Sequence, residues 1–222
     1  MSMRSAAYDV EGREKMEILV FGSTGSIGRQ LLEQALAQEH AVTAFARDPA
    51  KLDIKHANLK IVQGNVMEFA SIEKAVQGQQ AVLCSIGAGR KGTVRSEGTR
   101  HIVHAMANAG VRRFICQTTL GVGNSWGNLS FFWKYLMSGV VLRDAFADHE
   151  AQESYVKQSR LDWTIVRQGS FTNGKATGKY RHGFPSTEKA IKLKISRADV
   201  ADFMLKQLSD DTYLHKTPGL SY

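Results

Sequence analysis

The residues with the clearest chemical meaning form a glycine-rich turn, Gly22-Ser23-Thr24-Gly25-Ser26-Ile27-Gly28. Gly22 would permit a tight turn, Gly25 would let the backbone approach a pyrophosphate, and Gly28 would let a helix pack closely on a strand. The N–H groups at the start of that helix attract phosphate. Hydroxyl donors stand at Ser23, Thr24 and Ser26. The turn predicts a dinucleotide-binding site, and a turn without a ligand is the alternative.

A group of charged residues, Arg47-Asp48-Pro49-Ala50-Lys51, follows an apolar run over residues 42–46. At this strand end an acid typically binds the ribose of NAD, whereas an arginine accommodates the 2′-phosphate of NADP. Lys51 lies one turn from Arg47 if a helical turn starts at Pro49. These two cations favour NADP(H). Asp48 could instead bind a ribose or cap the turn, and the alternative is that Arg47 and Asp48 are solvated surface charges.

Two further segments are expected to touch the cofactor, because ligands of parallel sheets bind beyond the carboxyl ends of the strands. Gly64-Asn65-Val66 follows a predicted strand, and Asn65 could bond to adenine. Ser85-Ile86-Gly87 follows the next strand, and its glycine permits a close approach of the backbone. The predicted cofactor contacts here are Asn65, Val66, Ser85, Ile86 and Gly87.

A predicted helix over residues 143–159 carries two titratable side chains of catalytic interest. His149 and Glu153 are four residues apart and share a helix face, so one could hold the other toward a pocket. A histidine could donate a proton at neutral pH. The alternative for this pair is a solvated helix face.

The elements that must position these residues alternate between strand and helix. This alternation predicts an α/β fold of Rossmann type: a doubly wound parallel sheet with helices on both faces and a small C-terminal elaboration on the substrate side. Ser196-Arg197-Ala198-Asp199 predicts a capping box at the start of the last helix. We expect residues 1–15 to form a flexible extension and residues 16–222 a single domain. Strands are predicted at residues 17–21, 42–46, 59–62, 81–85, 114–117 and 163–166. Helices are predicted at residues 26–39, 69–77 and 143–159, and two further helices are expected to end at Gly110 and at Leu208.

Composition narrows the classes of function. The chain has 222 residues, 43% of them hydrophobic, which suffices for a buried core. No run reaches the roughly 18 apolar residues of a membrane span, and the N-terminus lacks a secretory signal, so a cytoplasmic protein is expected. The net charge of +8 is scattered, which suits an anionic ligand better than nucleic acid. Cys84 and Cys116 are expected to be small core residues rather than a disulfide or metal pair.

An aromatic segment over residues 126–135, WGNLSFFWKY, is the least ordinary stretch of the chain. Its rings could stack on a flavin, tetrapyrrole or quinone, or form a contact in a homo-oligomer. Docking on a membrane surface and packing into the core are the other two interpretations.

These motifs resemble the atypical short-chain dehydrogenases with an NAD(P)-binding, NmrA-like fold. The glycine turn is similar to their G-x-x-G-x-x-G pattern, residues 47–52 resemble their NADP-selecting segment, and Gly64-Asn65-Val66 resembles Gly-Asp-Val. Within this family, residues 96–103, 148–149 and 213–222 resemble the NADPH-dependent flavin and biliverdin reductases. The resemblance implies a Rossmann fold, NADP(H) as cofactor and a planar small-molecule acceptor.

The resemblance also bears on catalysis. It places the active-site serine or threonine of the family at Thr118, which would face the nicotinamide; the alternative is a threonine satisfied by its own backbone. The classical Tyr-x-x-x-Lys pair is absent, because Tyr155 has Ser159 at the lysine position. Two hypotheses follow: an NADPH-dependent oxidoreductase that transfers hydride to a flavin or quinone, or a non-catalytic NADP-binding redox sensor. A sugar-nucleotide epimerase is disfavoured, because it would need the missing tyrosine.

Overall fold

The computed structural model describes residues 15–88, 92–129 and 141–222. Its strands are β1 (Glu17–Phe21), β2 (Ala41–Ala46), β3 (Leu59–Gln63), β4 (Ala81–Cys84), β5 (Arg113–Thr119), β6 (Asp162–Gln168), β7 (Ser170–Thr172), β8 (Arg181–His182), β9 (Lys194–Ser196) and β10 (Gly219–Ser221). Its α-helices are α1 (Ser26–Ala37), α2 (Phe69–Val76), α3 (Val94–Ala109), α4 (Arg143–Gln158) and α5 (Arg197–Lys206).

The main sheet has the strand order β3-β2-β1-β4-β5-β6-β10-β8. The first seven strands of this order pair in parallel, and β8 pairs antiparallel with β10. Strand order reverses between β1 and β4, and in open α/β sheets the ligand crevice lies at such a reversal. The predicted Rossmann-type sheet is confirmed, and the glycine turn follows β1 at this reversal.

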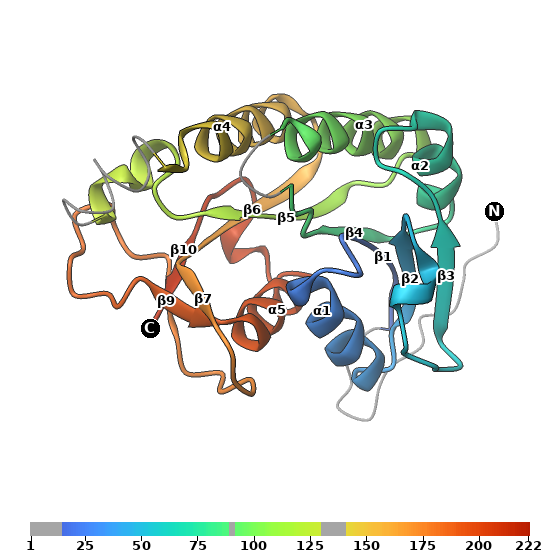
Figure 1. Ribbon diagram of the computed structural model, residues 1–222, viewed down its shortest axis with the longest axis horizontal. Coiled ribbons are helices and arrows are strands. Elements are labelled where there is room, and N and C mark those ends of the chain that lie inside the picture. Colours follow the sequence, from blue (N-terminus) through green and yellow to red (C-terminus); the bar gives the residue numbers. More distant parts are fainter. Residues whose placement is uncertain (1–14, 89–91, 130–140) are drawn as a thin grey trace.

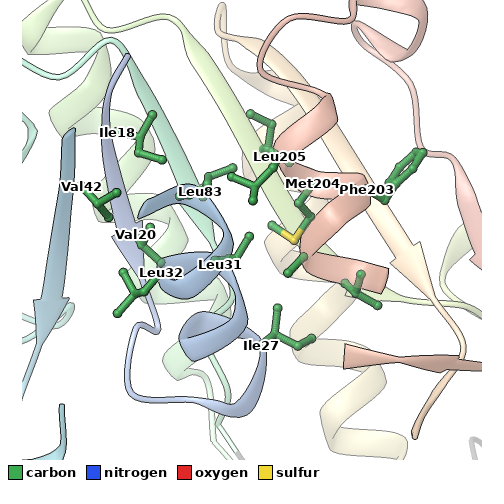
Figure 2. Packing of buried hydrophobic residues seen from close by; sticks show 14 of the residues in the cluster. Ile18, Val20, Ile27, Leu31, Leu32, Val42, Leu83, Phe203, Met204 and Leu205 are labelled. Carbon is green, nitrogen blue, oxygen red and sulfur yellow. The ribbon is translucent and has the colours of Figure 1, made fainter. Parts of the chain in front are cut away.

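Two helices cover one face of the sheet. Helices α1 and α5 lie side by side below the sheet in Figure 1, and the Gln34 side chain on α1 donates to the carbonyl oxygen of Ala198 on α5 at 3.0 Å. Figure 2 shows the apolar side chains between them, with Leu31 and Leu32 of α1 facing the strand residues and Met204 of α5 lying beside them. These side chains are fully buried, and the burial of each one stabilises the fold by about 1.5–3 kcal/mol.

Helices α2, α3 and α4 cover the opposite face (Figure 1). Ile72 of α2, Met106 of α3 and Val156 of α4 are fully buried against strand residues of this face. Cys84 and Cys116 lie in the same layer as register partners on β4 and β5, and both are free thiols. The helices on both faces agree with the prediction.

The C-terminal elaboration contains short strands that hydrophobic periodicity did not separate. β7 pairs with β9 in a two-stranded sheet, and β10 extends the main sheet beyond β6. Asp199 holds this region together, because its carboxylate accepts from the backbone N–H groups of Thr177 and Gly178 at 2.7 and 2.9 Å and from the hydroxyl of Tyr222 at 2.5 Å. The predicted N-terminal cap is confirmed, with Ser196 Oγ accepting from the N–H of Asp199.

In the parts of the chain that the structure describes, none of the helices combines the length and apolar character needed to cross a membrane. The same residues contain no group of three or more His, Cys, Asp and Glu side chains that could hold a metal ion. Most of the predicted extension, residues 1–14, lies outside the described residues.

Candidate functional site

The glycine turn joins β1 to α1 with the geometry of a phosphate-binding loop. Gly22 has a φ of +80°, a left-handed conformation that favours glycine. The N–H of Gly25 donates to the carbonyl oxygen of Gly22 at 2.9 Å and closes the turn. Gly25 caps α1 without any side-chain hydrogen bond. The first N–H groups of the helix therefore lack intrahelical partners, which suits a bound phosphate.

Backbone packing leaves no room for a side chain at two of these glycines. A Cβ at Gly28 would lie 2.1 Å from the carbonyl oxygen of Gly22, and a Cβ at Gly22 would lie 2.4 Å from that of Ser85. Both neighbours are backbone atoms, so neither can rotate away. The close approaches of α1 and of the residue after β4 to the turn make a backbone cradle, which fits the pyrophosphate of a dinucleotide.

The three hydroxyl groups of the turn have different surroundings. Ser23 is fully buried and donates to the carbonyl oxygen of Phe45 at 2.8 Å, so it ties the turn to β2. Ser26 accepts from Nε of Arg197 at 2.9 Å. Thr24 lines a cavity at the carboxyl ends of the strands. Of the three, the structure leaves Thr24 and Ser26 beside open space.

Arg197 is a residue that the sequence analysis did not single out. It begins α5, contacts Ser26 of the turn, and donates through Nη1 to Oδ1 of Asn173 at 2.8 Å. Its guanidinium carbon lies 5.1 Å from the centre of the Phe171 ring. It therefore places a positive charge beside the phosphate turn and links the turn to the wall of a neighbouring cavity. Its position depends on the packing of α5 against α1, which no local motif reveals.

A first cavity of about 160 Å³ lies between the turn and the ends of β2 and β3. Its lining includes seven of the predicted cofactor contacts together with Phe45 and Ala46. The predicted residues that line it are Gly22, Thr24, Gly25, Arg47, Val66, Ile86 and Gly87.

The charges around this cavity match the predicted 2′-phosphate site in part. Arg47 is exposed, lines the cavity, and has no side-chain hydrogen bond or ion pair with the rest of the described chain. Lys51 ends a 3-10 helix over Pro49–Lys51, as the sequence suggested, and its Nζ lies 3.5 Å from the carboxylate of Asp48. Asp48 is thus engaged with Lys51, and Arg47 is the charge open to a ligand.

Asn65 has a local structural contact. Its Oδ1 accepts from the N–H of Met67 at 3.1 Å, which fixes the turn after β3. The next residue, Val66, packs into the first cavity, and its carbonyl oxygen lies 3.0 Å from Nδ1 of His101. The structure therefore brings Val66 to the cavity and leaves Asn65 beside it.

Two further cavities continue from the first along the carboxyl ends of the strands. The second, of about 390 Å³, shares Gly25, Ile86 and Gly87 with the first. The third, of about 280 Å³, shares five residues with the second: Thr119, Leu142, Phe146, Gln168 and Phe171. Ser26, Ile27 and Ser85 also line the second cavity. Together the three cavities form one trough with a glycine-lined end and an apolar end.

Strand alternation turns Thr118 away from this trough. Thr118 is fully buried, and its hydroxyl donates to Oε1 of Glu153 at 3.0 Å on the α4 side of the sheet. Its neighbours Gln117 and Thr119 line the second cavity instead. Because successive residues of a strand point to opposite faces, an alignment shifted by one position exchanges a pocket residue for a core residue.

Glu153 is also a buried structural residue. Its two oxygens accept from Nε and Nη2 of Arg167 at 2.8 and 2.6 Å, and from Nζ of Lys157 at 2.6 Å, besides Thr118. Burial acts to raise the pKa of Glu153, but Arg167 and Lys157 hold it below its ordinary value. Glu153 therefore stays ionised and has no proton to donate at neutral pH. Contrary to the expectation of a mutual contact, it bonds to Arg167 rather than to His149.

His149 does reach the trough. It lines the second cavity, is 8% exposed, and its Nδ1 lies 3.0 Å from Oε1 of Gln152. Burial lowers the pKa of His149 to about 4, and the charge of Arg95 acts in the same direction. The imidazole is therefore neutral near pH 7, which argues against the expected proton donation.

Of the aromatic segment, the structure describes residues 126–129. Trp126 is 38% exposed and lies in a 3-10 helix over Gly123–Asn128. Leu129 lines the third cavity. The remaining residues of this segment, 130–135, lie outside the described residues.

The fold, the glycine cradle and the cavity at the end of β2 define a dinucleotide-binding protein of Rossmann type. The chain matches the NAD(P)H-binding family over residues 22–211 and belongs to it.

Individual relatives agree with this assignment. The chain is 30% identical over 205 residues to UPF0659 protein YMR090W of Saccharomyces cerevisiae, with 87% of each chain covered. It superposes on ChuY, an anaerobillin reductase from Escherichia coli O157:H7, with a TM-score of 0.77 and 24% identity over 92% of this chain and 96% of that one. It also superposes on a short-chain dehydrogenase/reductase from Veillonella parvula in complex with NADP, with a TM-score of 0.78 and 19% identity over 93% and 94% of the two chains. The two structural likenesses show the fold.

Proposed function

We propose that the protein is an NADPH-dependent oxidoreductase that transfers hydride to a planar small-molecule acceptor. The observation that carries the proposal is the continuity of the trough. Its first cavity shares Gly25, Ile86 and Gly87 with the second, which in turn opens into an apolar third cavity. A dinucleotide in the first cavity and along the glycine turn of the second would present its nicotinamide to a molecule that occupies the rest of the second cavity and the third.

The preference for NADPH over NADH rests on Arg47. Its guanidinium is exposed and forms no ion pair within the described residues, whereas the acid next to it, Asp48, is paired with Lys51. An open guanidinium at this strand end suits a 2′-phosphate, and the paired acid is less available for a ribose hydroxyl. The Veillonella parvula neighbour, which was solved with NADP, is consistent with this preference.

The acceptor end of the trough favours a flat, largely apolar molecule. Phe146, Phe171 and Leu142 line both the second and third cavities. The third cavity is also lined by Leu120, Leu129 and Leu193. Aromatic and aliphatic side chains bury the faces of a ring system, and they exclude water from its reacting atom. The polar residues that line the third cavity are Thr119, Gln168 and Ser170, and His149 lines the adjoining second cavity.

The bound cofactor supplies a hydride, and the acceptor gains that hydride and one proton. The protein orients the two molecules, as expected where hydride chemistry belongs to the cofactor. The chain lacks Tyr-x-x-x-Lys, Glu153 is ionised, and His149 is neutral. These residues supply no proton near pH 7, so the proton of the reduced acceptor comes from solvent.

The test is a panel of flavins, quinones and linear tetrapyrroles mixed with the protein and NADPH, with cofactor oxidation followed by absorbance. We expect steady oxidation with at least one planar acceptor, and slower oxidation when NADH replaces NADPH. Tight NADPH binding without turnover of any acceptor would contradict the proposal and favour a non-catalytic NADP-binding regulator.

A further inference from the structure

A buried chain of hydrogen bonds leads from the core to His149. Gln152 on α4 is fully buried, and its Nε2 lies 3.1 Å from Oγ1 of Thr99 on α3 and 3.3 Å from Sγ of Cys116 on β5. Its Oε1 lies 3.0 Å from Nδ1 of His149. With the amide nitrogen directed at a hydroxyl and a sulfur, the amide oxygen faces the imidazole and acts as an acceptor.

This arrangement sets the tautomer of His149. Because an amide oxygen can only accept, Nδ1 must carry the proton. Nε2 is then a lone-pair acceptor, and it has no hydrogen-bond partner within the described chain. His149 lines the second cavity, so this nitrogen is the group that the side chain has left for a ligand.

The electrostatic surroundings keep the ring neutral. Arg95 on α3 lies near His149 and is paired with Asp148 at 3.2 Å, and Glu153 is engaged with Arg167. Burial lowers the pKa of His149 to about 4. Within the described part of the chain, no carboxylate forms an ion pair with His149.

A second acceptor lies in the wall of the same cavity. Gln168, at the end of β6, is 3% exposed and lines both the second and third cavities. Its Oε1 is buried and has no hydrogen-bond partner in the described part of the chain. A buried polar atom without a partner costs free energy, which a ligand that donates a hydrogen bond would recover.

We propose that His149 is a specificity-determining residue whose Nε2 accepts a hydrogen bond from a ring N–H or an O–H of the acceptor molecule. The proposal rests on the proposed function and deepens it, because it divides the planar acceptors by chemistry. A flavin or a pyrrole-containing ring system carries such a donor. A simple quinone carries carbonyl oxygens, which are acceptors and would face the lone pair of His149 unfavourably.

The tautomer can be measured without any activity. In ¹⁵N NMR of the histidine-labelled full chain, with His149→Gln to assign the signal, we expect a protonated Nδ1 and an unprotonated Nε2, unchanged between pH 6 and pH 8. Gln152→Met should release the ring into a mixture of tautomers. A proton on Nε2 in the unmodified protein would overturn the proposal.

Binding provides the second test. The probes are lumiflavin, whose N3–H is its one ring donor, and N3-methyl-lumiflavin, which has none, each titrated into the NADP⁺-loaded protein. Loss of a buried hydrogen bond of this kind corresponds to about 10- to 100-fold in Kd, and we expect lumiflavin to bind more tightly by that factor. Gln152→Met leaves the His149 side chain in place but removes its hydrogen-bond partner, so it should reduce the ratio of the two Kd values several-fold. His104→Gln, at an exposed position, should leave this ratio unchanged.

The outcomes separate this inference from the proposed function. Equal Kd values for the two probes, or an unchanged ratio in Gln152→Met, would overturn the role of His149 even if flavin is reduced. A preserved ratio without NADPH oxidation would overturn the proposed function and leave the role of His149 standing. Failure of both probes to bind would contradict the inference as well.

Discussion

Arg167 on β6 and Glu153 on α4 form a buried two-pronged ion pair, with Nε and Nη2 of the guanidinium 2.8 and 2.6 Å from the two carboxylate oxygens. Both side chains are 2% exposed. Nη1 of the same guanidinium donates to Asn124, in the segment that leads to the aromatic region. The pair therefore joins the sheet, the covering helix and the 3-10 helix Gly123–Asn128.

Breaking this pair should destabilise the protein strongly. Glu153→Gln keeps the shape of the side chain but leaves the Arg167 charge buried without a counter-ion, so we expect a loss of about 3–5 kcal/mol in the free energy of unfolding. Denaturant melts followed by circular dichroism would measure it. Glu150→Gln, on the exposed side of the same helix, is the matched control and should change stability little. Equal free energies of unfolding for the two variants would show that the ion pair does not stabilise the fold.

Arg47→Ala should separate the two cofactors. Removing the guanidinium that lines the first cavity should weaken NADPH binding about 10- to 100-fold and leave NADH binding nearly unchanged. Isothermal titration with each cofactor gives both values. Lys51→Ala should have a smaller effect, because Lys51 is already paired with Asp48. An equal loss for both cofactors would remove the 2′-phosphate argument.

Gly28→Ala tests the packing of the cradle. The new methyl group would lie 2.1 Å from the carbonyl oxygen of Gly22, so α1 must move away from β1. We expect a loss of about 2–3 kcal/mol and a Tm lower by roughly 4–12 °C, together with weaker binding of NADPH and NADH alike. Gly87→Ala is the control for stability, since a Cβ there meets nothing within 4 Å. A variant as stable as the control would show that the turn adapts easily.

The stability of the protein should fall in mild acid because of His149. Its folded pKa of about 4 lies below the ordinary value of 6.5, so between these values the unfolded state binds more protons than the folded state. The contribution of His149 to the free energy of unfolding is therefore complete above pH 6.5. It decreases as the pH falls toward 4, by about 3 kcal/mol in total. His149→Asn should lose this part of the pH dependence, and the exposed His104→Gln should retain it. Parallel curves for all three proteins would contradict the shifted pKa.

Asp199→Asn should loosen the segment that Asp199 holds. The carboxylate accepts from Thr177, Gly178 and Tyr222, and the exposed Lys175 and Lys179 flank these contacts. We expect limited trypsin digestion to cleave at these lysines faster than in the unmodified protein, with the rest of the domain intact. Tyr222→Phe removes one of the bonds and should give a smaller acceleration. An unchanged digestion rate would mean that other contacts hold the segment.

The strand and helix pattern of the first part of the fold was accessible from sequence because it is local. β4 is a continuous apolar run, and β1 is apolar after Glu17. α1 repeats its apolar residues at helical spacing, and the glycine turn marks the junction of strand and helix. α3 was predicted only in its second half, because its first turns carry Arg95, Ser96 and Thr99, polar residues that the structure buries. The short strands β7 to β10 depend on pairing between distant segments, which no periodicity reveals.

The site divides in the same way. Arg47 and Val66 follow directly from their places at strand ends, and both line the first cavity. The prediction for Thr118 depended on the exact register of β5, and in the structure Gln117 and Thr119 line the second cavity instead. Gln168 and Arg197 gain their significance from contacts between elements far apart in the chain. Tertiary packing, rather than local pattern, selects which polar residues reach the trough.

The occupied Nδ1 of His149 and the fully bonded carboxylate of Glu153 have a kinetic consequence. In the proposed reaction, a cavity wall without a proton donor would leave the reduced acceptor as an anion until it meets bulk water. Turnover would then depend on hydride delivery and on escape of that anion, so deuterium on the transferred position would slow the reaction while heavy water would leave it almost unaffected. Such a cavity would favour acceptors whose reduced anions are long-lived. In these molecules, delocalisation of the negative charge stabilises the product in the absence of a proton donor.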